Sequence, residues 1–194
     1  FFSICVKKSH VNKIFVKNKC RNLKWLTTFK GKEKTMVEIT LLIWLICVNG
    51  APILLAKILG KRFNIPIDGS RLWRDGQPLF GQSKTIRGIL VALLVSIGVG
   101  SLLQLPIVMS ITFGLLSMVG DLTSSFVKRR LGYKPSAMAL GIDQIPESLF
   151  PLLGIQFWLM LSFSQIVGIV LTFFCVALML SRILFWLRIR KTPY

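Results

Sequence analysis

Asp121 is an acidic residue within a segment, Ile107 to Val127, that otherwise carries no charge. A carboxylate inside a membrane segment costs a few kcal/mol unless a cation or a partner neutralises it. On a helix, spacings of three and four residues place side chains on one face. Such spacings join Asp121 to a row of small or polar residues: Ser110, Gly114, Ser117, Ser125 and Lys128. The row favours either a functional cation site or a packing seam in which Lys128 or Arg129 pairs with Asp121.

Lys128, Arg129 and Arg130 follow the acidic residue directly at the end of this segment. Arg binds phosphate oxygens in a bidentate manner, and Lys contributes a compact point charge. The alternative is an ordinary basic anchor at the cytoplasmic end of a membrane helix. The nearby Asp121 favours the phosphate-binding interpretation.

A second acidic group surrounds Pro146, with Asp143 before it and Glu147 after it. Proline is tolerated in the first turn of a helix, so both acids could simply complement a helix N-terminus. Alternatively, Asp143 joins Asp121 around a hard divalent cation. Magnesium prefers carboxylates, waters and substrate phosphates as ligands. The sequence therefore predicts a Mg²⁺ site with Asp121 and Asp143 as the metal ligands.

The polar stretch 60–87 is rich in glycine and basic residues and contains Asp75, Lys84 and Arg87. A loop of this kind can hold phosphate groups. It is not a P-loop, because the first glycine of that motif is missing and no strand precedes it. Asn49 lies inside an apolar segment upstream, where its amide needs a partner within a bundle.

Other catalytic chemistries are excluded by the residues that the chain lacks. The only histidine is His10, and the four cysteines form no CxxC pair. A Cys/His zinc site is therefore not expected. A Ser-His-Asp or Cys-His triad is not expected either.

The elements that must position these residues are five apolar segments. Hydrophobic residues make up 53% of the 194 residues and charged residues only 16%. About 20 apolar residues span the hydrocarbon core as a helix. The chain is therefore expected to be an all-α, polytopic membrane bundle of about five transmembrane helices, at about 37–59, 88–105, 107–127, 149–163 and 166–187.

The basic residues predict the orientation of this bundle. They lie in the loops 60–87 and 128–146 and at the C-terminal end, whereas the connections at Pro106 and at Ser164–Gln165 carry none. Basic loops stay on the cytoplasmic side. We therefore expect the N-terminal end of the bundle outside and its C-terminal end inside. A site built from the two long loops then faces the cytoplasm.

The net charge of +18 is uneven, since residues 1–35 hold ten Lys or Arg and a single acid, Glu33. This stretch has neither a helical apolar period nor the layout of a signal peptide. We interpret 1–35 as a non-native or disordered basic extension and 36–194 as one membrane-embedded catalytic domain. Because the remaining basic residues flank apolar segments, the expected partner is lipid and not nucleic acid.

Together these pieces resemble the CDP-archaeol synthase family, relatives of the phosphatidate cytidylyltransferases. The resemblance runs from about Asn49 to Leu153, and more loosely to the C-terminus. It rests on the order and spacing of the following motifs: Asn49-Gly50-Ala51-Pro52, Asp75-Gly76-Gln77-Pro78-Leu79-Phe80-Gly81, Ser83-Lys84-Thr85-Ile86-Arg87-Gly88, Gly120-Asp121, Ser125-Phe126-Val127-Lys128-Arg129-Arg130-Leu131-Gly132 and Asp143-Gln144.

The resemblance implies a magnesium-dependent transfer of CMP from CTP to a membrane lipid phosphate. The expected catalytic residues are Asp121, Lys128 and Asp143, and those that bind substrate phosphates are Lys84, Arg87, Arg129, Arg130 and Lys134. Supporting roles are expected for Asn49, Asp75 and Ser125. Assembly into a homo-oligomer is compatible with this interpretation.

The chain departs from the family pattern at two points. Pro146 stands where archaeal members tend to have an acid. The His-Gly-Gly and second Asp-Arg signatures of the broader phosphatidate enzymes are absent. The identity of the lipid phosphate is therefore left open. The alternative functions are a small transporter, with its acid near the bilayer midplane, and an assembly factor that holds anionic lipid with its basic loops.

Overall fold

The computed structural model describes residues 34–60, 62–69, 71–133 and 139–187. These residues form five α-helices: α2 (Lys34–Leu59), α3 (Ile86–Leu102), α4 (Ile107–Arg130), α5 (Gln144–Leu159) and α6 (Phe163–Trp186). The expectation of an all-α bundle of five helices is confirmed. Within the described residues, α2, α4 and α6 are long and apolar enough to cross a membrane, and α3 is a shorter apolar helix. The expected extension 1–35 falls almost entirely outside the described residues.

The connection between α5 and α6 differs from the expected one. Ser164 and Gln165 were expected to form it, but both belong to α6. Ser162 caps this helix, because its side chain accepts a hydrogen bond from the Gln165 amide while the Gln165 side chain accepts one from the Ser162 amide. This reciprocal capping box fixes the start of α6. The chain reverses just before it at Met160, which has a left-handed backbone with φ of 50°.

Helix α5 begins at Gln144, before the apolar segment that starts near residue 149, and a helix start around Pro146 was one of the expected alternatives. Pro146 lies in its first turn, where the missing amide hydrogen removes no helical hydrogen bond. The helix therefore includes Glu147, which lies between the expected loop 128–146 and the apolar segment at about 149–163. This early start brings an acidic side chain into the bundle.

Small residues and one aromatic stack hold α4 against α2 and α3. The rings of Trp44 and Phe113 stack with their centroids 4.0 Å apart, and both side chains are fully buried. The Ser96 hydroxyl donates to the Ser110 carbonyl over 2.6 Å. A Cβ atom at Gly114 would lie 2.8 Å from that of Ser96, closer than packed side chains allow. The small-residue face of α4 is thus the face that packs inward, as expected.

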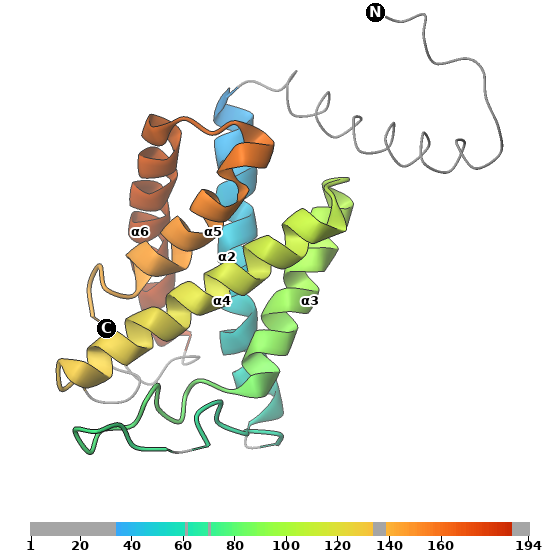
Figure 1. Ribbon diagram of the computed structural model, residues 1–194. Helices are drawn as coiled ribbons and strands as arrows, with labels where there is room; N and C mark the ends of the chain where they lie inside the picture. The colour runs from blue at the N-terminus through green and yellow to red at the C-terminus, as the bar shows by residue number, and fades with distance from the viewer. Residues whose placement is uncertain (1–33, 61, 70, 134–138, 188–194) are drawn as a thin grey trace, which may run out of the picture.

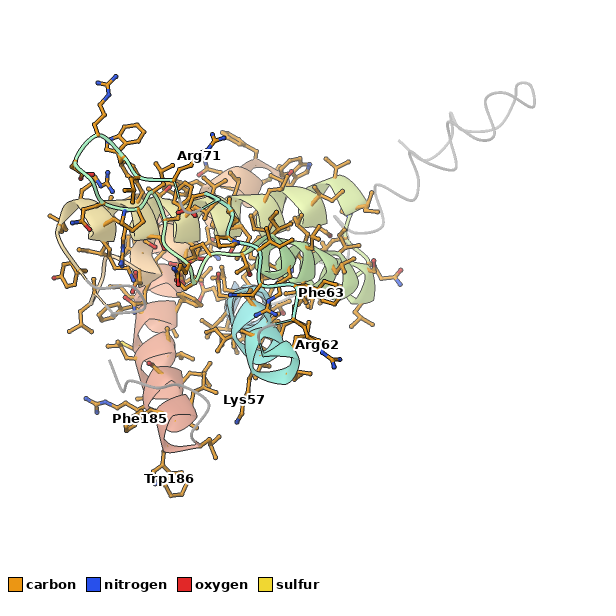
Figure 2. The ribbon with its side chains drawn as sticks, turned by 90° about the horizontal axis from the view of Figure 1, so that it is seen from below. Lys57, Arg62, Phe63, Arg71, Phe185 and Trp186 are labelled. Carbon is orange, nitrogen blue, oxygen red and sulfur yellow. The ribbon has the colours of Figure 1, made fainter. Side chains whose placement is uncertain are left out.

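The polar loop between α2 and α3 lies at one end of the bundle, beside the C-terminal end of α4 (Figure 1). Backbone hydrogen bonds fold the loop on itself, including one from the Ile67 amide to the Lys84 carbonyl over 2.9 Å. Figure 2 views this end and shows Lys57 and Arg62 near the end of α2, and Trp186 at the end of α6. Basic and aromatic residues are typical of helix ends that meet the membrane surface.

Candidate active site

Asp121 forms an ion pair with Lys84, a residue of the loop before α3. The Lys84 Nζ atom lies 2.5 Å and 2.6 Å from the two Asp121 carboxylate oxygens. The alternative of a salt bridge from Asp121 to Lys128 or Arg129 is therefore wrong in its partner. Thr85 caps α3 with its hydroxyl and anchors the loop, so that the neighbouring Lys84 side chain reaches α4. Both charged side chains are about one-fifth exposed, at 22% and 21%.

A second ion pair joins Lys128 to Asp143. Lys128 Nζ lies 2.8 Å from one Asp143 carboxylate oxygen and 3.0 Å from the other. The second oxygen also accepts a hydrogen bond from the Ala139 amide. The Lys128 side chain is only 9% exposed. Arg129 is also buried, and its guanidinium group is attracted electrostatically by the Asp143 carboxylate. The two proposed metal ligands, Asp121 and Asp143, thus each hold a lysine.

Arg130 anchors the polar loop to the end of α4. It forms an ion pair with Asp75 at 2.9 Å and donates to the Pro78 carbonyl over 2.8 Å. Its guanidinium lies over the Phe126 ring, 5.0 Å from the centroid, and Trp73 meets the same ring edge-on. Arg130 and Asp75 therefore fix where the loop lies relative to α4.

The remaining expected residues separate into those near the cluster and those away from it. Arg87 donates to the backbone carbonyls of Gly60 and Arg62 and to the Asn64 side chain, beyond the end of α2 and not toward Asp121. Lys134 lies outside the described residues. Ser125 is buried on α4.

Asn49 finds the expected partners inside the bundle. It donates to the Leu45 carbonyl over 3.1 Å and accepts from the Ser117 hydroxyl over 2.9 Å. Because Ser117 is one turn before Asp121 on α4, this hydrogen bond ties α2 to the helix face that carries the acid.

Glu147 is the site residue that the sequence analysis did not assign. Its carboxyl group interacts electrostatically with the Asp121 carboxyl group and with the charged groups of Lys84 and Asp143. The first turn of α5 can approach this closely because α4 has Gly120 at the contact, where an added Cβ would lie 2.2 Å from the Pro146 carbonyl oxygen. The available signal was the four-residue spacing between Asp143 and Glu147, which places both acids on one helix face.

The charge of Lys84 is stabilised by the carboxylates around it. Burial lowers the pKa of Lys84, but Asp121 together with the more distant Glu147 and Asp143 raises it, and the pKa lies above its usual value. Lys84 therefore stays an ammonium ion at physiological pH. It places a fixed positive charge against Asp121.

The donor set fits magnesium bound jointly by protein and substrate. Within the described residues, no group of three or more Asp, Glu, His or Cys side chains is arranged to hold a metal ion. Magnesium commonly uses one or two carboxylates and takes its other ligands from water and substrate phosphates. Asp121 meets this requirement, because its two oxygens already hold a cationic group at 2.5 Å and 2.6 Å.

The helical fold and the charged cluster together define the class of protein. Apolar side chains such as Leu94 and Leu171 cover the outside of the helices at 69% and 60% exposure, as in lipid-facing surfaces. Charged side chains gather between the helices and the loop at one end. The protein is a multi-pass membrane protein with a polar site at one end of its helical bundle.

The chain belongs to the CDP-archaeol synthase family, since the family model described as CarS-like, CDP-archaeol synthase, matches residues 36–194. The CDP-archaeol synthase of Pyrococcus furiosus is 38% identical over 106 residues, which cover 50% of this chain and 60% of that protein. That of Sulfurisphaera tokodaii is 32% identical over 135 residues, which cover 66% of this chain and 81% of that protein.

A solved structure of an intramembrane enzyme for archaeal membrane lipid biosynthesis has a similar fold. The TM-score is 0.63 at 28% sequence identity, and the match covers 72% of this chain and 89% of the other. This similarity agrees with the helical membrane architecture. The matched region spans 60% of the length of the Pyrococcus protein, so the chain aligns with only part of that relative.

Proposed function

We propose that the protein transfers CMP from CTP to a membrane lipid phosphate and releases pyrophosphate. The observation that carries this proposal is the pair of lysine–carboxylate contacts, Lys84–Asp121 and Lys128–Asp143, between the helices at one end of the bundle. Such a cluster can bind phosphates and a divalent cation together. Membership of the CDP-archaeol synthase family supports the same chemistry.

The reaction requires positioning and charge neutralisation more than a reactive side chain. An oxygen of the lipid phosphate forms a bond to the α-phosphorus of CTP. The bond from that phosphorus to the oxygen shared with the β-phosphorus breaks, and pyrophosphate leaves with the electron pair. The lipid phosphate is itself the nucleophile, so no covalent enzyme intermediate is needed. Holding the two reactants in line and stabilising the developing charge can supply most of the rate enhancement.

Each residue of the cluster has a role in this proposal. Asp121 and Asp143 would hold Mg²⁺, which when bound neutralises the phosphate oxygens and increases the electrophilicity of the α-phosphorus. Lys84, Lys128 and Arg129 bind the substrate phosphates as fixed positive charges. Arg87, Arg130 and Asp75 hold the polar loop, and Asn49 ties α2 to α4. Lys134, which was expected to bind a substrate phosphate, lies outside the described residues.

We place the active site on the cytoplasmic side of the membrane, because the basic loops lie at the same end as the cluster. The N-terminal end of α2 then lies outside. In a variant whose four native cysteines are replaced by serine, single cysteines introduced at Arg62 and at Gln104 should react with a membrane-impermeant thiol reagent from opposite sides of sealed vesicles. Arg62 follows α2 and Gln104 lies in the turn between α3 and α4. Labelling of Arg62→Cys only from outside intact cells would contradict the orientation.

The proposed activity is tested with the detergent-purified full chain, CTP, Mg²⁺ and a panel of lipid phosphates that differ in their apolar chains. We expect a CDP-lipid with at least one acceptor, and no product when EDTA removes the metal. A parallel reaction with ATP, GTP or UTP measures the choice of base. A folded protein that makes no nucleotide–lipid product from any acceptor would contradict the proposal.

A further inference from the structure

The ammonium group of Lys84 occupies the place at Asp121 that a metal ion requires. It contacts both carboxylate oxygens, at 2.5 Å and 2.6 Å. A divalent cation bound by Asp121 needs at least one of the same oxygens. Two cations cannot share that position, because they repel each other strongly where water is partly excluded. Lys84 and a metal ion at Asp121 must therefore compete.

Glu147 places a second carboxyl group next to the Lys84–Asp121 ion pair. The first turn of α5 packs against Gly120 of α4, so that Glu147 on α5 lies close to Asp121 on α4, and the two carboxyl groups interact. One ammonium can neutralise only one ionised carboxyl group, whereas a divalent cation can bind both carboxyl groups in their ionised form. Carboxylate oxygens are the ligands that such a cation prefers.

The position of Glu147 follows from the backbone and not from a flexible side chain alone. The Ser117 hydroxyl, which donates to Asn49 over 2.9 Å, also lies 3.4 Å from the Glu147 carbonyl oxygen. A Cβ at Gly120 would lie 2.9 Å from the Glu147 amide nitrogen. The contact between the first turn of α5 and Gly120 therefore fixes the position of the Glu147 backbone.

The backbone of Lys84 is held, so exchange of its partner involves the side chain. The Lys84 carbonyl accepts from the Ile67 amide over 2.9 Å, and its amide donates to the Gly81 carbonyl over 3.1 Å. The lysine side chain has four rotatable bonds and a compact charge, and it can turn to another anion without moving the loop. The phosphates of an incoming nucleotide provide that anion.

We propose that Lys84 is an internal cation that holds the Asp121–Glu147 pair before substrate binds, and that metal and nucleotide replace it together. This inference rests on the proposed nucleotide-transfer function. It adds Glu147 as a metal ligand and explains how the carboxylates stay paired without metal. Metal binding alone must displace Lys84, whereas metal with nucleotide gives its ammonium a phosphate partner. Metal affinity should therefore rise when the nucleotide is present.

The test measures Mn²⁺ binding to the detergent-purified full chain without nucleotide, by the loss of the free-ion electron paramagnetic resonance signal. Lys84→Met removes the competitor and should tighten Mn²⁺ binding at least about fivefold, the lower end of typical coupling between two ligands. Glu147→Gln removes a ligand and should weaken binding roughly tenfold or more. Lys57→Met is the matched control, because Lys57 is an exposed lysine near the same end of the bundle, and it should change nothing.

The two variants are expected to change the Mn²⁺ affinity in opposite directions, and this difference distinguishes the proposal from a purely structural role of Lys84. If Lys84 only stabilises the fold, Lys84→Met will leave Mn²⁺ affinity unchanged or weaken it, and the proposal is wrong. Unchanged affinity in Glu147→Gln overturns the assignment of Glu147. Wild-type protein provides a test that does not depend on how the variants fold. Acetic anhydride should modify Lys84 faster when Mn²⁺ is present, and an unchanged rate relative to Lys57 would contradict the exchange.

These outcomes are distinguishable from failure of the proposed function. A wild-type protein that makes no CDP-lipid, but whose Lys84→Met variant binds Mn²⁺ more tightly, would keep the cation exchange and remove the nucleotide transfer. An active wild-type protein whose variants bind Mn²⁺ as tightly as wild type would keep the nucleotide transfer and remove the cation exchange.

Discussion

The two halves of α4 differ in what they contribute to the protein. From Ile107 to Gly120 the helix has no charged residue, and it packs through serine, glycine and a stacked aromatic ring. From Asp121 to Arg130 it carries four charged residues, which pair with the polar loop and with the region where α5 begins. Both halves belong to one continuous helix, so close packing in the first half determines where the charges of the second half lie.

The contact at Gly120 is where this dependence is most direct. Gly120 is the last residue of the packing half, and its missing side chain lets the Pro146 carbonyl approach. The next residue along α4 is Asp121 and the next along α5 is Glu147. The close contact between the two backbones therefore places the carboxyl groups of these two residues next to each other. The predictions below separate the packing role from the chemical role.

Asp121→Asn should produce the largest effect on activity. The amide keeps the shape of the side chain but removes the charge that holds a cation. We expect nucleotide transfer to fall by roughly 100-fold or more, as when one electrostatic stabiliser of a transition state is removed. Activity is measured across a magnesium titration, with thermal unfolding as the control for folding. Near-normal activity with an unchanged magnesium response would show that Asp121 has a packing role and does not bind the metal.

Gly120→Ala should impair both stability and activity. The added Cβ meets backbone atoms of Pro146 at 2.2 Å and 2.5 Å, so the two helices must move apart. Overpacking of this kind costs about 1–3 kcal/mol. Because small displacements at a reacting centre have large effects on rate, transfer per folded molecule should also fall, by roughly tenfold. A variant with wild-type stability would show that the two helices do not touch there.

Gly114→Ala should affect stability alone. Its Cβ would lie 2.8 Å from the Ser96 Cβ and 3.2 Å from the Leu93 side chain, which can give way more easily than backbone. We expect a loss of about 1 kcal/mol, at the low end for overpacking, and unchanged transfer per folded molecule. Gly98→Ala is the matched control, since nothing lies within 4 Å of an added Cβ at that position. A selective loss of activity in Gly114→Ala would contradict the division of the helix.

The Lys84–Asp121 pair should make stability fall at alkaline pH. The pKa of Lys84 is raised in the folded protein, so the pair contributes fully below the unfolded-state value of about 10.4. This contribution is lost as the pH rises through the higher folded-state pKa. Thermal unfolding of wild type should therefore lose more stability above that pH than unfolding of Lys84→Met. Parallel curves for the two proteins would show that the ion pair does not contribute to stability.

Local patterns in the sequence predicted the helices and most of the charged cluster. Apolar length gave the five helices, and the three-to-four-residue spacing on α4 gave the inward face that carries Asp121. The partner of Asp121 could not be read in the same way. Lys84 is 37 residues away, and its approach depends on how the loop folds against α4.

Glu147 was missed for a related reason. The apolar pattern of α5 begins only at Leu149, and Glu147 was interpreted as a charge that complements a helix N-terminus. The true start depends on a proline in the first turn and on the contact with Gly120, and neither produces a hydrophobic signal. Pairings between distant segments, and helix ends set by tertiary contacts, are thus what the sequence pattern left undetermined.

The position of the transferred phosphorus tests the central claim most directly. Purified protein is incubated with Mg²⁺, a lipid phosphate acceptor and CTP labelled at either the α-phosphorus or the γ-phosphorus. We predict that the α label enters the lipid product and the γ label is released in pyrophosphate. Entry of the γ label into the lipid, or release of both labels without a lipid product, would contradict transfer of CMP by this protein.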